Sequence, residues 1–120
     1  RVVAWLNRQP AETLFISTIS VSEILFGIEA LMAGRRRNRL AEAFESAILL
    51  LFAGRVLNFD LDAARAYASL MSAARARRLS ISVIDGQIAA IAKANGFSVA
   101  TRDEAPFHAA GLKVVNPWKE

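Results

Sequence analysis

The positions of apolar and polar residues along the chain follow two alternating periods. Short apolar runs of strand length stand at 14–18 and 97–101. Longer segments between them repeat apolar residues three and four apart, as over 61–78, which is typical of helices. Strands that alternate with helices predict an α/β fold whose mostly parallel sheet is covered on both faces. The expected helices are 2–7, 20–33, 40–52, 61–78 and 84–95, and the expected strands are 14–18, 56–59, 97–101 and 113–115.

Three carboxylates occupy positions next to these expected strand ends and helix starts. Glu23 follows the first strand, Asp85 opens the helix 84–95, and Asp103 comes just after the strand 97–101. In open parallel sheets, sites form beyond the carboxyl ends of the strands. A carboxylate is costly to desolvate unless a helix N-terminus or a cation compensates it. We therefore expect the three to converge at one end of the sheet as a hard-cation site, suited to phosphoryl chemistry.

Each acidic motif also has a purely structural interpretation. A Ser or Thr followed three residues later by an acid is the pattern of a capping box, in which the acid only caps a helix. A second feature near Glu23 is Gly27, which costs helix propensity of roughly 1 kcal/mol and suggests close approach of another backbone or a ligand. The surface beside Asp85 is bare, which suits either a large substrate or tight helix packing. The capping patterns are Ser20-x-x-Glu23, Ser82-x-x-Asp85 and Thr101-x-x-Glu104.

Length and composition narrow the class of protein. The 120 residues suffice for one domain over 1–120, and 54% hydrophobic residues with a mean hydropathy of +0.31 argue against disorder. No apolar run is long enough for a transmembrane helix. The absence of cysteine excludes disulfides and thiolate metal sites, and it fits a reducing cytoplasm. The chain begins at Arg1 inside an amphipathic pattern, so we expect a fragment.

Arginine dominates the positive charge of the chain. Lys and Arg number 15 against 11 Asp and Glu, which gives a net charge of +4. Two arginine clusters stand at 35–39 and 75–78. They can be solvated helix C-termini, where cations are favoured, or a surface for nucleic acid or an acidic partner. Both interpretations stay open for each cluster.

The ordered set of motifs resembles a known family. The chain is similar to PIN-domain ribonucleases, specifically to VapC-type toxins of bacterial toxin–antitoxin modules and their FitB-like relatives. No single motif is decisive, but their order along the whole chain is specific. The segments that carry the resemblance are 2–6, 20–27, 51–55, 85–90, 99–103 and 114–118.

The resemblance implies a three-layer α/β/α sandwich and a catalytic site. Glu23, Asp85 and Asp103 match the family's metal ligands, which bind Mg²⁺ or Mn²⁺ and position a water for attack on an RNA phosphodiester. Thr101 matches a position whose hydroxyl supports that site. The implied protein is a metal-dependent endoribonuclease toxin.

One departure from the family pattern concerns its first strand. In the family this strand ends in Asp-Thr-Asn, carries the first metal ligand and lies between the strands that match 14–18 and 97–101. The sequence starts after it, so we expect the central strand and one carboxylate to be absent and the 120-residue chain to be inactive. A separate segment should then fill the slot, and direct pairing of the two flanking strands would contradict this expectation.

The resemblance also implies partners: an RNA substrate, a cognate antitoxin and, through the antitoxin, operator DNA. An alternative function is a non-catalytic binding subunit of a DNA-binding complex, and a third is another α/β metal-dependent phosphohydrolase. We further expect a homodimer, because the helices 20–33 and 40–52 carry more apolar surface than one core needs. The residues concerned are Ile24, Leu25, Ile28, Leu31, Ile48, Leu49 and Phe52.

Overall fold

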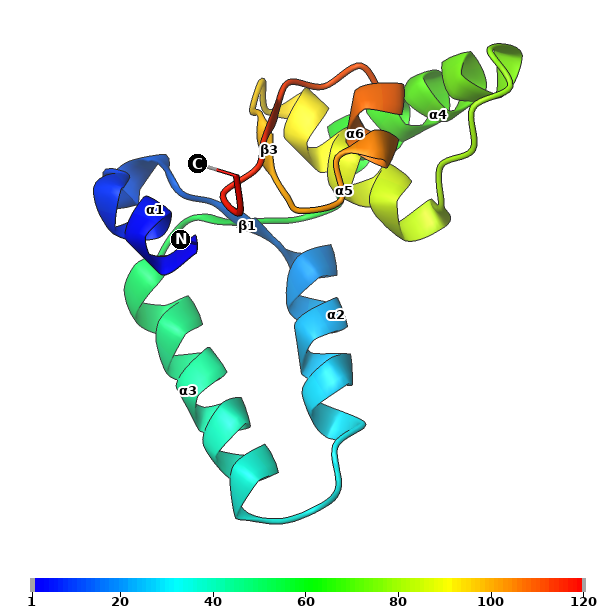
Figure 1. Cartoon of the computed structure of the whole chain (residues 1–120). Helices are drawn as coiled ribbons and strands as arrows, with labels where there is room; N and C mark the ends of the chain where they lie inside the picture. Colours follow the sequence, from blue (N-terminus) through cyan, green and yellow to red (C-terminus); the bar gives the residue numbers. More distant parts are fainter. Residues whose placement is uncertain (1, 120) are drawn as a thin grey trace. The chain divides into compact units, whose positions relative to one another are not determined.

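A computed structural model of the chain, which describes residues 2–119, shows helices connected by short strands (Figure 1). Within these residues the strands are two residues long, and helices make up most of the structure. The elements in chain order are α1 (Val2–Arg8), η1 (Ala11–Thr13), β1 (Ile16–Ser17), α2 (Thr18–Glu29), α3 (Arg35–Leu51), β2 (Val56–Leu57), α4 (Leu61–Ala76), α5 (Val83–Ala94), β3 (Val99–Ala100), α6 (Ala105–Ala109) and β4 (Val114–Val115).

The strands pair in parallel, as the alternation of strands and helices predicted. β1 pairs with β2, with Ile16 opposite Val56, and β3 pairs with β4, with Val99 opposite Val114. The strands are shorter than predicted because residues at their ends belong to other elements. Ser17, for example, is already the N-cap residue of α2. The two pairs belong to separate sheets, so within residues 2–119 β1 and β3 are not paired with each other. The expected strand between them stays a prediction.

The chain divides into two compact units, of which one comprises residues 10–57. It contains the hairpin of α2 and α3 together with β1 and β2. Arg55 ties its ends together: Nε donates to the Leu14 carbonyl at 3.0 Å, and Nη2 donates to the Leu51 carbonyl. No residue of α2 or α3 is buried. Their apolar side chains therefore remain available for a partner.

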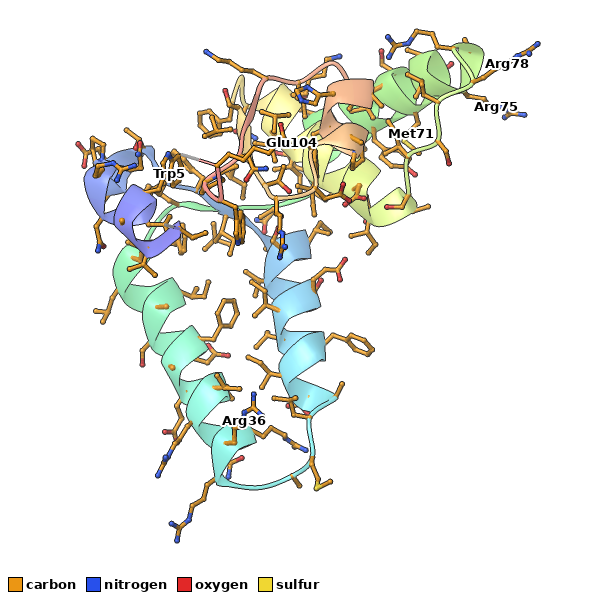
Figure 2. All side chains as sticks on the ribbon, viewed as in Figure 1. Trp5, Arg36, Met71, Arg75, Arg78 and Glu104 are labelled. Atoms are coloured by element: carbon orange, nitrogen blue, oxygen red, sulfur yellow. The ribbon has the colours of Figure 1, made fainter. Side chains whose placement is uncertain are left out.

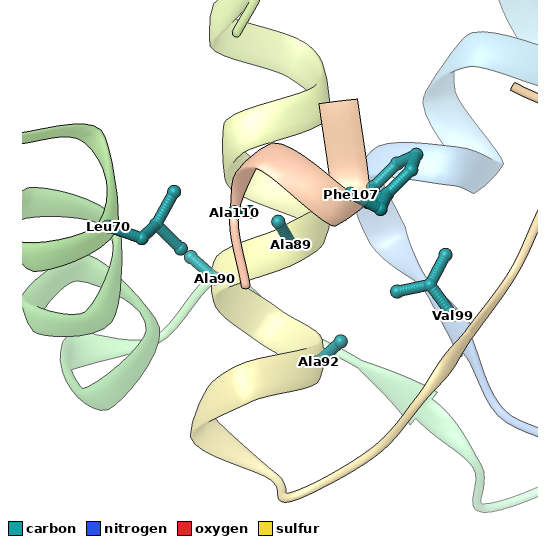
Figure 3. Packing of buried hydrophobic residues seen from close by; sticks show 7 residues of the cluster. All are labelled: Leu70, Ala89, Ala90, Ala92, Val99, Phe107 and Ala110. Atoms are coloured by element: carbon teal, nitrogen blue, oxygen red, sulfur yellow. The ribbon is translucent and has the colours of Figure 1, made fainter. Parts of the chain in front are cut away.

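The other unit comprises residues 2–9 and 58–119 and holds the hydrophobic core. Small residues on α5 let α4 approach closely, and Leu70 of α4 reaches toward Ala90 (Figure 3). A Cβ atom built on Gly86 would lie 2.7 Å from Met71 Sδ and 3.0 Å from Tyr67 Cε2. The bare surface beside Asp85 thus serves helix packing. The buried cluster consists of Leu70, Ala89, Ala90, Ala92, Val99, Phe107 and Ala110.

The first arginine cluster lies at a helix start, and the prediction of a helix beginning at residue 40 was wrong. α3 begins at Arg35, five residues earlier, so the whole cluster 35–39 occupies its first turns. The helix dipole is positive there and opposes arginine, which excludes favourable interaction with a C-terminus as the explanation of this cluster. One of its members, Arg37, forms an ion pair of 3.5 Å with Glu29 of α2.

The segment 20–33, predicted as one helix, likewise differs at both ends: α2 begins at Thr18 and ends at Glu29. Within residues 2–119, no helix has both the length and the apolar character required to cross a bilayer.

Candidate functional site

Glu23 lies on an exposed face in the second turn of α2. The helix is capped by Ser17, whose Oγ accepts a hydrogen bond of 3.0 Å from the Ser20 N–H. Ser20 is therefore inside the helix, and the capping-box interpretation of Ser20 and Glu23 is wrong. Among the described residues, no hydrogen bond or ion pair involves the Glu23 carboxylate. Its charge is free to bind a ligand.

Gly27, one turn after Glu23, faces open space. No atom of the described chain lies within 4 Å of the position that a Cβ would occupy. No backbone of the described chain therefore approaches this glycine closely. The close approach that we expected would have to come from a ligand or a partner.

Asp85 is half-buried in the first turn of α5. The N-cap residue Ser82 accepts a hydrogen bond of 3.1 Å from the Asp85 backbone N–H. Only this half of the expected capping box forms, because within residues 2–119 the Asp85 carboxylate has no hydrogen-bond or ion-pair partner. The positive end of the α5 helix dipole favours a negative charge at this position. The cap therefore fixes the backbone and leaves the carboxylate for other use.

Asp103 follows β3 in an exposed loop that Thr101 holds in place. The Asp103 N–H donates to Thr101 Oγ1 at 3.2 Å, and the Thr101 N–H donates to the Val115 carbonyl at 2.9 Å. The Thr101 backbone thus links the loop to β4, and the Thr101 hydroxyl holds the backbone of Asp103. In this way the hydroxyl can support a neighbouring metal ligand. The third capping pattern is not formed, since Glu104 stands at the N-cap of α6 without a side-chain cap.

Glu104, which is next to Asp103 and is labelled in Figure 2, is the centre of a polar network. Its Oε2 accepts from Asn116 Nδ2 at 2.8 Å and from Lys119 Nζ at 3.0 Å, and His108 Nε2 lies 3.5 Å from Oε1. The hydrogen bond from Asn116, followed by that from Lys119, lowers the pKa of Glu104 from its ordinary 4.5 to about 2. Asn116 was not predicted from the sequence, although it had a signal there: it is a polar residue directly after the apolar pair Val114 and Val115.

We expect the Glu104 network to make stability depend on acid pH. Because the pKa of Glu104 is depressed in the folded state, its contribution is fully present above about pH 4.5 and is lost as the pH falls toward 2. Urea unfolding of wild type and Glu104→Gln across pH 2 to 7 measures this. The difference in unfolding free energy between them should shrink with acidification. Glu42→Gln on α3 is the control, and a difference independent of pH would contradict the assignment.

The three acidic side chains and Thr101 offer oxygen donors alone. Asp85 and Asp103 belong to the unit of residues 58–119, and Glu23 belongs to the unit of residues 10–57. Within residues 2–119, no group of three or more His, Asp or Glu side chains is close enough to hold a metal ion. Carboxylate and hydroxyl oxygens without thiolate or imidazole suit a hard cation such as Mg²⁺ or Mn²⁺. The donor chemistry of these residues therefore fits the expected metal.

Comparison with known proteins connects these residues to a family. Residues 1–112 match the PIN domain family model. The chain is 51% identical over 118 residues to VapC ribonuclease Y4jK of Sinorhizobium fredii, covering 98% of this chain and 84% of that protein. It is 44% identical over 120 residues to toxin FitB of Neisseria gonorrhoeae, covering 100% and 86%. A solved structure of FitAB bound to an IR36 DNA fragment has a TM-score of 0.91 and 44% identity, covering 97% and 81%.

Proposed function

The chain belongs to the PIN-domain family, and from that premise we propose that it is a metal-dependent endoribonuclease toxin of a toxin–antitoxin module. One observation carries the proposal. Asp85 and Glu23 stand where capping boxes were possible, yet neither carboxylate caps a helix or pairs with a cation within residues 2–119. Both side chains are therefore available to bind a ligand. The 51% identity to a VapC ribonuclease supports RNA as the substrate.

We assign metal binding to Glu23, Asp85 and Asp103. A bound Mg²⁺ or Mn²⁺ supplies a water of lowered pKa and neutralises charge that develops on the phosphate. Ser82 accepts a hydrogen bond from the Asp85 backbone N–H and so fixes this residue in the first turn of α5. Thr101 holds the backbone of Asp103 and so sets the direction of that loop. Ser82 and Thr101 thus position the backbone of two of the assigned ligands.

A cognate antitoxin and a second copy of the chain are the proposed protein partners. The solved structure of FitAB bound to an IR36 DNA fragment, at a TM-score of 0.91, supports assembly into a complex that binds DNA, and we propose that the antitoxin makes the DNA contact. α2 and α3 expose large apolar side chains, among them Ile24, Phe26 and Leu49, at 41%, 74% and 70%. A homodimer built on these faces would cover them. Light scattering that gives the mass of a single chain at every concentration would contradict the dimer.

Cleavage of RNA by the protein produced from its complete gene tests the proposed function. With Mn²⁺ or Mg²⁺ we expect cleavage of a single-stranded RNA within its sequence, and we expect EDTA to abolish it. Added Mn²⁺ should restore the activity, because the carboxylates release the ion reversibly.

Three results would oppose the proposal. RNA cleavage that continues in EDTA would show that the activity does not depend on a divalent metal ion. Hydrolysis of a phosphomonoester with RNA left intact would favour a phosphohydrolase. Antitoxin-dependent DNA binding, with no RNA cleavage by the free protein, would favour the alternative of a non-catalytic binding subunit.

A further inference from the structure

A hollow of about 560 Å³ opens beside the C-terminal end of α4. The apolar floor of the hollow is lined by Met71, Leu79 and Ile81. Its polar lining comes from Arg75, Arg78 and Ser80. Figure 2 shows Arg75 and Arg78 projecting from the same end of α4, with Met71 further along the helix. The volume of the hollow lies within the range of small-ligand sites, roughly 300–1,000 Å³.

The two arginines of the hollow lie at the C-terminal end of α4, where the helix dipole favours cations, and they have no counter-ion among the described side chains. Arg77, between them in sequence, donates from Nη2 to the Ala109 carbonyl at 2.7 Å and so serves the fold. Within residues 2–119, the side chains of Arg75 and Arg78 make neither an ion pair nor a hydrogen bond. A guanidinium is planar and suits bidentate binding of phosphate oxygens. The hollow is therefore complementary to an anion attached to an apolar group.

The backbone at Arg78 gives a second, independent observation. α4 ends in a Schellman motif, in which the Leu79 N–H donates to the Ala74 carbonyl at 2.9 Å and Arg78 has φ 58°. α5 ends in the same way, but there Gly96 occupies the left-handed position with φ 70°. Glycine adopts this conformation without strain, whereas arginine does not. Arg78 thus occupies a position whose backbone conformation favours glycine, which is consistent with a use of its side chain.

The hollow adjoins the helix turn that carries Asp85. Met71 lines the hollow and also lies against Gly86, the residue after Asp85, where a built Cβ would be 2.7 Å from Met71 Sδ. The segment 79–82 leads from the rim of the hollow directly into α5. One side chain therefore separates the hollow from the backbone next to Asp85.

We propose that Arg75 and Arg78 bind a backbone phosphate of single-stranded RNA close to the nucleotide at Asp85, while the apolar floor receives the attached base. This subsite rests on the proposed ribonuclease function and deepens it, because it positions the substrate beside the carboxylates. Phosphate contacts of this kind position a nucleic acid without reading its sequence. The second arginine cluster lies at the C-terminus of α4, where cations are favoured, and the subsite would give two of its members a further role.

Fluorescence anisotropy with a labelled, mixed-sequence RNA of about 16 nucleotides tests the subsite. The titrations are made in EDTA, so that cleavage does not interfere. We expect the Arg75→Ala/Arg78→Gly double variant to bind about tenfold more weakly than wild type. The salt dependence of log K should become shallower by about 0.7, the value for one phosphate contact on a single strand.

Two variants control for charge and for folding. Arg65→Ala removes one positive charge from the same helix, as each substitution of the double variant does, and RNA binding should change less than about twofold; Arg65 pairs with Asp62 at 3.2 Å. Arg78→Gly alone relieves the left-handed arginine, so its melting temperature should equal or exceed that of wild type while RNA binding falls.

Three results would overturn the subsite: wild-type RNA affinity and salt slope in the double variant, an equal loss in Arg65→Ala, or a loss confined to binding of the antitoxin protein. Failure of the proposed function would look different. The wild-type protein would then not cleave RNA with Mn²⁺, although RNA binding that depends on Arg75 and Arg78 could persist.

Discussion

Replacement of Asp85 by asparagine is expected to lower RNA cleavage by at least about 100-fold in the protein produced from its complete gene. Loss of a residue that merely orients a metal ligand costs about 10- to 100-fold, and loss of a ligand's charge should exceed this. The substituted asparagine still presents its backbone N–H to Ser82, so the cap of α5 and the fold should be kept. Multiple-turnover cleavage at saturating Mn²⁺ measures the effect.

Asp62→Asn is the matched control for this variant. Asp62 is an exposed aspartate in the first turn of α4, and its only described ion pair is with Arg65. It should retain wild-type cleavage. Near-normal activity in Asp85→Asn would remove Asp85 from the site.

The largest expected effect on stability is that of Leu70→Ala. Leu70 is 3% exposed and reaches from α4 into the cluster formed with Ala90 of α5 (Figure 3). Its truncation should lower the free energy of unfolding by about 2–5 kcal/mol, through lost burial and the cavity left behind. This is a large part of the about 5–15 kcal/mol that stabilises a typical domain.

Leu61→Ala provides the same chemical change on the same helix at a 64% exposed position. It should cost about 0.5 kcal/mol or less. Urea unfolding of both variants, followed by circular dichroism, measures the difference. Equal losses in the two variants would mean that packing between α4 and α5 does not hold this unit together.

The sequence predicted α4 and α5, in the unit that contains residues 58–119, closely because their periodicity and end signals agree. α5 was expected over 84–95 and spans Val83–Ala94, with Gly96 in the left-handed position that ends it. α4 was expected over 61–78 and ends at Ala76, because the Schellman motif takes Arg77 and Arg78 out of the helix. The parallel strands and the α/β class were also predicted correctly.

Other boundaries could not be predicted, for physical reasons. The first turns of α3 are all polar, Arg35 to Arg39, so hydrophobic periodicity begins only at Leu40. Ser17 and Ser20 are both acceptable N-caps, and only the backbone shows that Ser17 takes the role and frees Glu23. α6 is five residues long, too short for a periodic signal, and the sequence analysis did not predict it.

We propose that Glu23, Asp85 and Asp103 bind one divalent cation, and Mn²⁺ binding followed by electron paramagnetic resonance measures this. The protein from its complete gene should bind Mn²⁺ at one saturable site. Glu23→Gln, Asp85→Asn and Asp103→Asn should each weaken that site by about 10-fold or more, whereas Asp62→Asn should leave it unchanged. Wild-type Mn²⁺ affinity in Glu23→Gln would contradict the claim.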